Sequence, residues 1–96
     1  MINKKEQVVE NYLRDSVRER GGLCLKLIIM GKRNFPDRTV LCRPGHIFFV
    51  ELKKEGKDAT KTQSWFHRLL KKLGFKVYVC TTKAKVDKIL DKEMET

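Results

Sequence analysis

Apolar residues recur with a helical period near the start of the chain. The spacing i, i+3, i+4, i+7 and i+8 is occupied by Val9, Tyr12, Leu13, Ser16 and Val17, and charged residues fill the other face. This pattern predicts an amphipathic helix over residues 3–20. Asn3 is a suitable N-cap with Glu6 as its capping-box partner, and two glycines, Gly21 and Gly22, end the helix.

Four short segments have the composition of β-strands. Residues 23–30 form an almost continuous apolar run bounded by glycines, which predicts the first strand. Residues 39–43 and 46–53 are separated by a Pro-Gly dipeptide, which is typical of a turn and predicts a hairpin. Residues 75–80 are rich in β-branched and aromatic side chains and predict a fourth strand.

Apolar residues return to helical spacing at residues 60–73 and 83–93, which predicts two further helices. The expected order is αβββαβα. A crossover helix between the last two strands makes that pair parallel, with a right-handed connection. The sequence has no repeat, low-complexity tract or internal linker. We therefore expect one α/β domain over residues 1–96, with a mixed sheet flanked by helices.

The charge balance narrows the function. The chain has 22 Lys and Arg against 12 Asp and Glu, a formal net charge of +10, and this favours a polyanionic partner such as nucleic acid. A hydrophobic content of 41% argues against a disordered chain, and no apolar run approaches the roughly 20 residues of a membrane span. The N-terminus also lacks the apolar region of a signal peptide. We expect a cytoplasmic protein with no membrane contact and no small-molecule substrate.

The three cysteines point to packing. Cys24, Cys42 and Cys80 each lie in an apolar run, and there is no CxxC pair, so we interpret them as small buried hydrophobes. A zinc site that combines Cys42 and Cys80 with His46 and His67 lacks the spacing of a zinc finger or ribbon.

The candidate chemistry consists of an acid in a turn and an acid with a lysine on a strand. Asp37 follows Pro36, whose ring fixes φ, and the hairpin brings Asp37 towards Glu51. Glu51 and Lys53 share one face because strand side chains alternate. Two close carboxylates repel each other unless one is protonated or a cation lies between them, and Mg²⁺ prefers such oxygen ligands. Lys53 would then orient a water or neutralise developing charge.

The same three residues also allow a structural interpretation. Glu51 and Lys53 can form a solvated ion pair, and Asp37 can be an ordinary turn residue. Their placement favours a site, because a Glu and a Lys within a strongly apolar strand are costly to bury without partners.

The sequence also resembles a known family. Pro36-Asp37, thirteen intervening residues and Glu51-Leu52-Lys53 resemble the PD-(D/E)xK nuclease signature. The fuller pattern resembles the virus-type replication-repair nuclease (VRR-NUC) domain, in particular its small stand-alone phage members. The matching features, in order, are an acid-bearing first helix, Gly21 and Gly22, residues 31–37, residues 49–53, Gln63 and residues 73–78.

The resemblance implies a restriction-endonuclease-like core and metal-dependent hydrolysis of phosphodiester bonds, with Mg²⁺ as cofactor and Mn²⁺ as a substitute. It implies Asp37 and Glu51 as metal ligands, the backbone carbonyl of Leu52 as a further ligand, and Lys53 at the attacking water.

Two further site positions follow from the resemblance. The first-helix glutamate of the family contacts water at the metal, and Glu10 fits that position by its register better than Glu6 does. Gln63 matches a site residue in the next helix, although it also completes a capping box that begins at Thr60.

Stand-alone members are similar to archaeal Holliday junction resolvases. The resemblance therefore implies a homodimer that cuts four-way DNA junctions, in the host cytoplasm if the protein is phage-encoded. Asn34 departs from the family, because many relatives carry glycine there. Trp65 and Phe66 are expected in the core or at a dimer surface. The residues expected to contact the DNA backbone flank the site in sequence and are Lys32, Arg33, Arg38, Lys54, Lys57 and Lys61.

Two other functions remain open at this point. One is a non-catalytic basic module that only binds nucleic acid, and the other is a nuclease subunit of a larger replication or repair assembly that acts on flaps. Metal dependence distinguishes the first from a nuclease, and the preferred DNA structure distinguishes the second.

Overall fold

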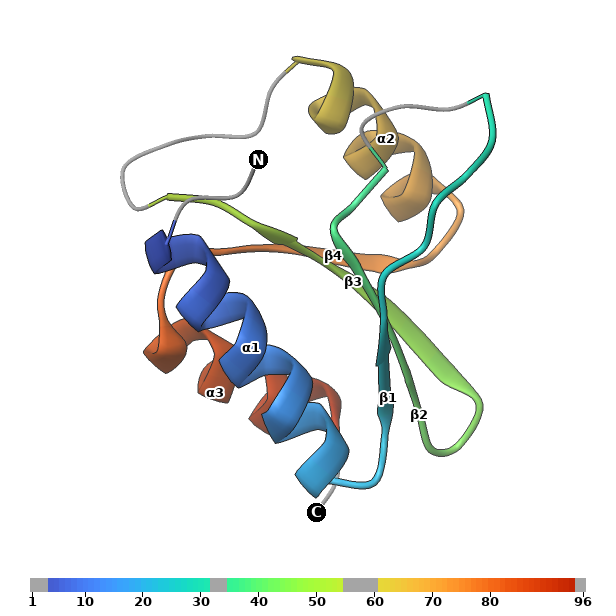
Figure 1. Cartoon of the computed structure of the whole chain (residues 1–96). Coiled ribbons are helices and arrows are strands. Elements are labelled where there is room, and N and C mark those ends of the chain that lie inside the picture. The colour runs from blue at the N-terminus through green and yellow to red at the C-terminus, as the bar shows by residue number, and fades with distance from the viewer. Residues whose placement is uncertain (1–3, 32–34, 55–60, 95–96) are drawn as a thin grey trace.

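A computed structural model describes residues 4–31, 35–54 and 61–94, with only the backbone at residues 61–64. The helices and strands follow the expected order αβββαβα (Figure 1). All but one of the seven expected elements agree with the sequence interpretation to within one residue at each end. The elements are α1 (Lys4–Glu19), β1 (Leu23–Leu25), β2 (Arg38–Cys42), β3 (His46–Leu52), α2 (Lys61–Lys72), β4 (Lys76–Cys80) and α3 (Lys83–Glu93).

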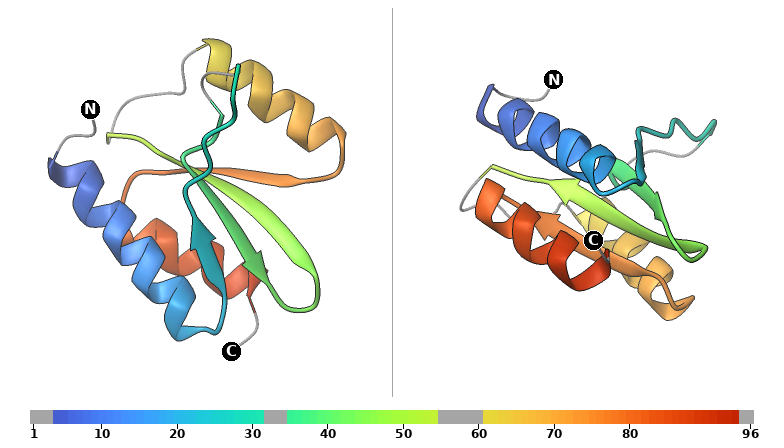
Figure 2. Two further views of the ribbon diagram at one scale, coloured as in Figure 1. Left: turned by 45° about the vertical axis from the view of Figure 1, so that its right-hand side comes forward. Right: turned by 90° about the horizontal axis from the view of Figure 1, so that it is seen from below.

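The four strands form one mixed sheet in the order β1-β2-β3-β4. The first three strands are antiparallel neighbours, and β3 and β4 are parallel, as the crossover through α2 predicts. The helices α1 and α3 cover one face of the sheet, and α2 lies on the other (Figure 2). No helix in the described ranges is both long and apolar enough to cross a membrane.

The central strand β3 supplies both faces of the core. Phe48, Val50 and Leu52 belong to the larger cluster, together with residues of α1 and α3. Phe49 belongs to a smaller cluster with Leu70 and Val77, on the face that α2 covers. Because side chains alternate along a strand, Glu51 points to the same face as Phe49.

The cysteines pack in or against the hydrophobic core, as their positions in apolar runs predicted. Cys80 is fully buried in the larger cluster, and Cys24 and Cys42 are partly buried against it. Within the described part of the chain, no group of three or more His, Cys, Asp and Glu residues could hold a metal ion, so a zinc site of this kind is absent there.

The first strand is shorter than the prediction of residues 23–30, because β1 ends at Leu25. If its register with β2 continued, Leu27 would lie opposite Asp37. The backbone N–H of Asp37 is donated to the Glu51 carboxylate instead, so it is not available to β1. The remaining apolar residues of this run therefore leave the sheet.

A small polar cluster joins the end of α3 to the sheet. Glu93 lies 2.7 Å from Nε2 of His46, at the start of β3, and accepts a hydrogen bond from the hydroxyl of Tyr78 on β4. Although burial raises the pKa of Glu93, the hydrogen bonds from Tyr78 and His46 outweigh it and hold the pKa below the usual value. The ionised form of Glu93 therefore stabilises the fold.

Replacing Glu93 with glutamine should lower the free energy of unfolding by about 1–2 kcal/mol at pH 7, because a charged acceptor of two hydrogen bonds is lost. A lowered folded-state pKa contributes stability above the ordinary value of 4.5 and loses it as the pH falls through the folded-state value. Urea unfolding between pH 3 and pH 7 measures this, with the exposed Glu19→Gln as control. A difference that is independent of pH would contradict it.

Candidate functional site

The hairpin of β2 and β3 brings the two acids of the sequence motif together. Arg38 pairs with Val50, so the same register places Asp37 directly opposite Glu51. The backbone N–H of Asp37 donates to Oε1 of Glu51 at 3.1 Å, and the backbone N–H of Leu52 donates to Oδ2 of Asp37 at 2.8 Å. Each acid is therefore held by the backbone of the strand that carries the other.

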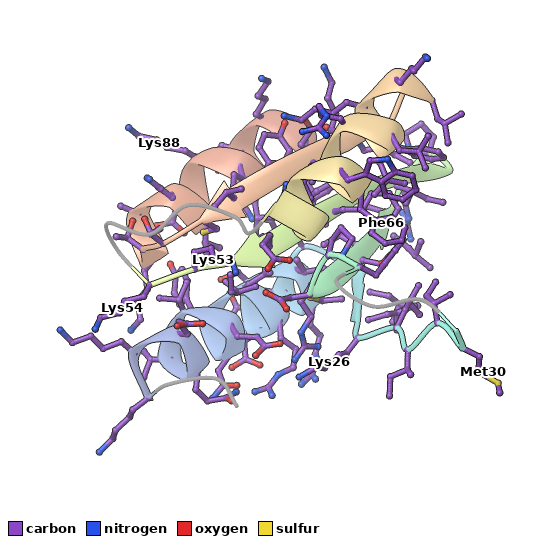
Figure 3. All side chains as sticks on the ribbon, turned by 90° about the horizontal axis from the view of Figure 1, so that it is seen from above. Lys26, Met30, Lys53, Lys54, Phe66 and Lys88 are labelled. Carbon is purple, nitrogen blue, oxygen red and sulfur yellow. The ribbon has the colours of Figure 1, made fainter. Side chains whose placement is uncertain are left out.

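Lys53 completes the arrangement. Its Nζ lies 3.4 Å from Oε2 of Glu51, and the Glu51 side chain is only 1% exposed. A solvated surface pair does not fit this burial, because the carboxylate has almost no contact with water. In Figure 3, Lys53 lies near the ends of β3 and α1, and Lys54 points outward.

Burial and repulsion between acids raise the pKa values of both carboxylates. Burial raises the pKa of Glu51 to about 7, and the nearby Asp37 carboxylate adds to the effect, which Lys53 only partly offsets. Burial likewise raises the pKa of Asp37, and the charge of Glu10 adds to this increase. Two ionised acids at this position are therefore stabilised by an added cation.

The backbone adds a third oxygen on the same side. In a strand the N–H and C=O of one residue point towards the same neighbouring strand. The N–H of Leu52 points to Asp37, whereas the N–H of Lys53 donates to Cys80 on the opposite side, at 2.9 Å. The carbonyl of Leu52 therefore lies on the side of Asp37.

This donor set fits a hard divalent cation. It consists of two carboxylates and one carbonyl, and carboxylate oxygens have lone pairs left after the hydrogen bonds described above. Mg²⁺ is commonly held by one or two carboxylates together with waters and substrate phosphate, so three or more acidic side chains are not required.

The first-helix acid is buried next to this group. Glu10 is 2% exposed, and its Oε2 lies 2.6 Å from Nε of Arg38 and 4.0 Å from Nζ of Lys26. Its charge also contributes to the raised pKa of Asp37. The structure thus places Glu10 within electrostatic reach of Asp37. Glu6 lies one turn earlier and lines the cleft beside Lys53 that is described below.

Arg38 does not have the place expected of a DNA-backbone contact. Its side chain is only 12% exposed and is held by the ion pair with Glu10. Arg38 lies on the face of β2 that α1 covers, so its charge stabilises the buried carboxylate of Glu10. The sequence offered no direct signal for this pair, because the two residues are 28 positions apart.

Lys26 is the cation that the sequence interpretation left unassigned. It is 63% exposed, approaches Glu10 and lowers the pKa of Asp37. Its position as the single charge within an apolar run is the signal that could have identified it.

A cleft of about 380 Å³ opens beside Lys53. It lies between the start of α1, the end of β3 and the residues before α3. The polar residues that line it besides Lys53 are Lys5, Glu6, Lys54, Thr81 and Thr82. A larger cleft of about 530 Å³ lies at the opposite end of the hairpin, and none of the expected site residues lines it.

The structure describes only some of the other residues expected at the site or at a dimer surface. Among the proposed DNA contacts, Lys54 is exposed at the end of β3. Trp65 is 52% exposed, and Phe66 packs edge-on against Phe35, with ring centroids 5.7 Å apart. The side chains that fall outside the description are Lys32, Arg33, Lys57, Lys61 and Gln63, together with Asn34.

The chain has recognisable relatives. No family model matches it. It is 39% identical, over 75 residues, to the protein named "Putative nuclease p44" of Acyrthosiphon pisum secondary endosymbiont phage 1. This match covers 78% of this chain and 81% of that protein. A solved structure described as "VRR_NUC domain" superposes with a TM-score of 0.88 at 32% identity, over 93% of this chain and 97% of that chain.

Both likenesses extend over most of this chain and most of the other protein, so they concern the whole fold and not an isolated motif. They agree with the resemblance drawn from Pro36-Asp37 and Glu51-Leu52-Lys53, which is therefore confirmed. The chain belongs to the VRR-NUC family.

Proposed function

We propose that this protein is a Mg²⁺-dependent endonuclease that hydrolyses phosphodiester bonds in DNA. The observation that carries the proposal is the placement of two acids, the partly buried Asp37 and the buried Glu51, directly opposite each other with Lys53 3.4 Å from the second. Membership of the VRR-NUC family and the net charge of +10 support it. Mn²⁺ is expected to substitute for Mg²⁺.

In this mechanism Asp37, Glu51 and the Leu52 carbonyl would hold the metal ion. When bound there, the ion would supply Lewis-acid chemistry to the phosphate and to a water molecule. The protein contributes the fixed geometry, because each acid is hydrogen-bonded to the backbone of the neighbouring strand. No side chain must reorganise to bring the two acids together.

Lys53 acts at the substrate. Its ammonium lies beside Glu51 and is 18% exposed, so it can reach a phosphate that approaches from the cleft. A fixed positive charge there orients the attacking water and neutralises charge that develops on the phosphate oxygens.

Glu10 and Gln63 are the remaining proposed site residues. Glu10 would accept a hydrogen bond from a water of the site, and Arg38 positions its carboxylate through the 2.6 Å ion pair. Gln63 belongs to the first turn of α2, which lies on the face of the sheet to which Glu51 points.

The proposed substrate is branched DNA, and specifically the four-way junction. Lysines that face the cleft or solvent near the site would hold phosphates without reading bases. A homodimer would present two such sites across a two-fold axis, which matches the symmetry of a four-way junction. A purely binding module is less well supported, because the two adjacent carboxylates of Asp37 and Glu51 weaken an anion-binding surface.

The first test is cleavage of a labelled four-way junction, with flap, splayed and linear duplexes alongside, in Mg²⁺ or Mn²⁺. We expect cleavage of the junction, which requires the metal and is lost in Asp37→Asn. Lys53→Ala should reduce cleavage by about 10²–10³-fold and leave junction binding nearly unchanged, because its charge acts mainly in the transition state.

The exposed Lys88→Ala is the matched control for loss of a positive charge. If none of these substrates is cut at any metal or pH condition, the enzyme assignment is overturned. Preference for flaps over junctions would favour the nuclease subunit of a larger assembly.

A second test uses stability. The folded-state pKa of Glu51, about 7, is above its ordinary value of 4.5, so stability present below pH 4.5 is lost as the pH rises through 7. In metal-free buffer, Glu51→Gln should therefore melt at a higher temperature than the wild type at pH 8 and at a similar temperature at pH 4. Added Mn²⁺ should raise the melting temperature of the wild type at pH 8 and have little effect on the variant.

Thermal unfolding followed by circular dichroism measures this, with Glu19→Gln as the control for an exposed acid. An equal Mn²⁺ effect on the wild type and Glu51→Gln would remove Glu51 from the metal site.

A further inference from the structure

The segment between β1 and β2 begins and ends at the candidate site. At its start Nζ of Lys26 lies 4.0 Å from Oε2 of Glu10, and at its end Asp37 faces Glu51. Between these ends the chain runs outward, and Figure 3 shows Met30 at the edge of the molecule, far from Lys53. We call residues 27–30 the apolar tip.

The apolar tip exposes four consecutive large hydrophobic side chains. Ile28 and Met30 are 93% and 94% exposed, whereas Leu27 and Ile29 are 42% and 38% exposed. This alternation is that of an extended chain, so Ile28 and Met30 project on the same side. Single exposed hydrophobic residues are common, but a run of four usually indicates a function.

We propose that the apolar tip is a wedge that enters the branch point of the DNA substrate, where Ile28 and Met30 replace base stacking. This inference rests on the proposed nuclease function and names the feature that would select branched DNA. Isoleucine, leucine and methionine are side chains that proteins insert between bases to unstack them. A branch point is the place where stacking is already interrupted.

Charge favours DNA over a second copy of this chain as the occupant. The exposed Lys26 lies at the base of the tip, and the chain has a net charge of +10. A second copy would bring another strongly cationic surface to this place, whereas DNA brings phosphates. The tip is also continuous with the candidate site, which must contact DNA in any case.

The length of the segment limits where the cut would fall. From Lys26 to Met30 an extended chain spans at most about 14 Å. Successive phosphates of one strand are about 3.4 Å apart along the duplex axis, so the tip reaches at most about four nucleotides from the scissile phosphate. Cleavage is therefore expected within about four nucleotides of the branch.

The test uses a four-way junction with 2-aminopurine at the branch point, in Ca²⁺ so that binding is observed without cleavage. The wild type should raise the 2-aminopurine fluorescence, and the double variant Ile28→Ser with Met30→Ser should not. In Mg²⁺ the double variant should cut the junction about tenfold or more slowly and keep its affinity for linear duplex. The pair Ile28→Leu with Met30→Leu should retain both signals, and Leu73→Ser, 65% exposed at the end of α2, is the control.

Two outcomes would overturn the wedge. One is a serine double variant that unstacks and cuts the junction like the wild type. The other is a sedimentation experiment in which the wild type is a dimer and the serine double variant a monomer, because the tip would then be an interface between copies. If the wild type cuts no DNA at all, the proposed function fails, and the fluorescence in Ca²⁺ still tests the wedge separately.

Discussion

The register between β2 and β3 is the constraint on which the candidate site depends. It places Asp37 opposite Glu51, and a slip of one residue would turn Glu51 to the face that α1 and α3 cover. The same slip would remove Phe48 and Val50, both fully buried, from the larger core cluster. The hydrophobic core therefore fixes the spacing of the acids, and folding and site assembly are one event.

The arrangement of the acids in the site is electrostatically unfavourable. Burial raises the pKa values of both Asp37 and Glu51. The charge of Asp37 raises the pKa of Glu51 further, and the charge of Glu10 raises that of Asp37. The protein compensates locally, with Lys53 at Glu51 and Arg38 at Glu10. These cations are placed at the edges of the acid cluster, so they limit the repulsion and still leave carboxylate lone pairs for a metal ion.

Most of the fold and the central pair of acids could be predicted from the sequence. The helical and strand periods and the Pro-Gly turn are local signals, and they are sufficient to predict that Asp37 lies near Glu51. The end of β1 could not be predicted, because it depends on a backbone N–H, that of Asp37, which is donated to Glu51 and not to β1. The ion pair of Glu10 with Arg38 was also missed, because it depends on how α1 packs on the sheet, which no local pattern specifies.

The contact between α3 and the start of β3 has a consequence for how the protein is handled. His46 is bound by Glu93, and five residues further along the same strand, about 17 Å away, Glu51 meets Asp37. The strand β3 is thus held at both ends, by the last turn of α3 at one end and by Asp37 at the other. An affinity tag or fusion partner that disturbs that last turn would therefore loosen β3 at the end that lies far from the acids.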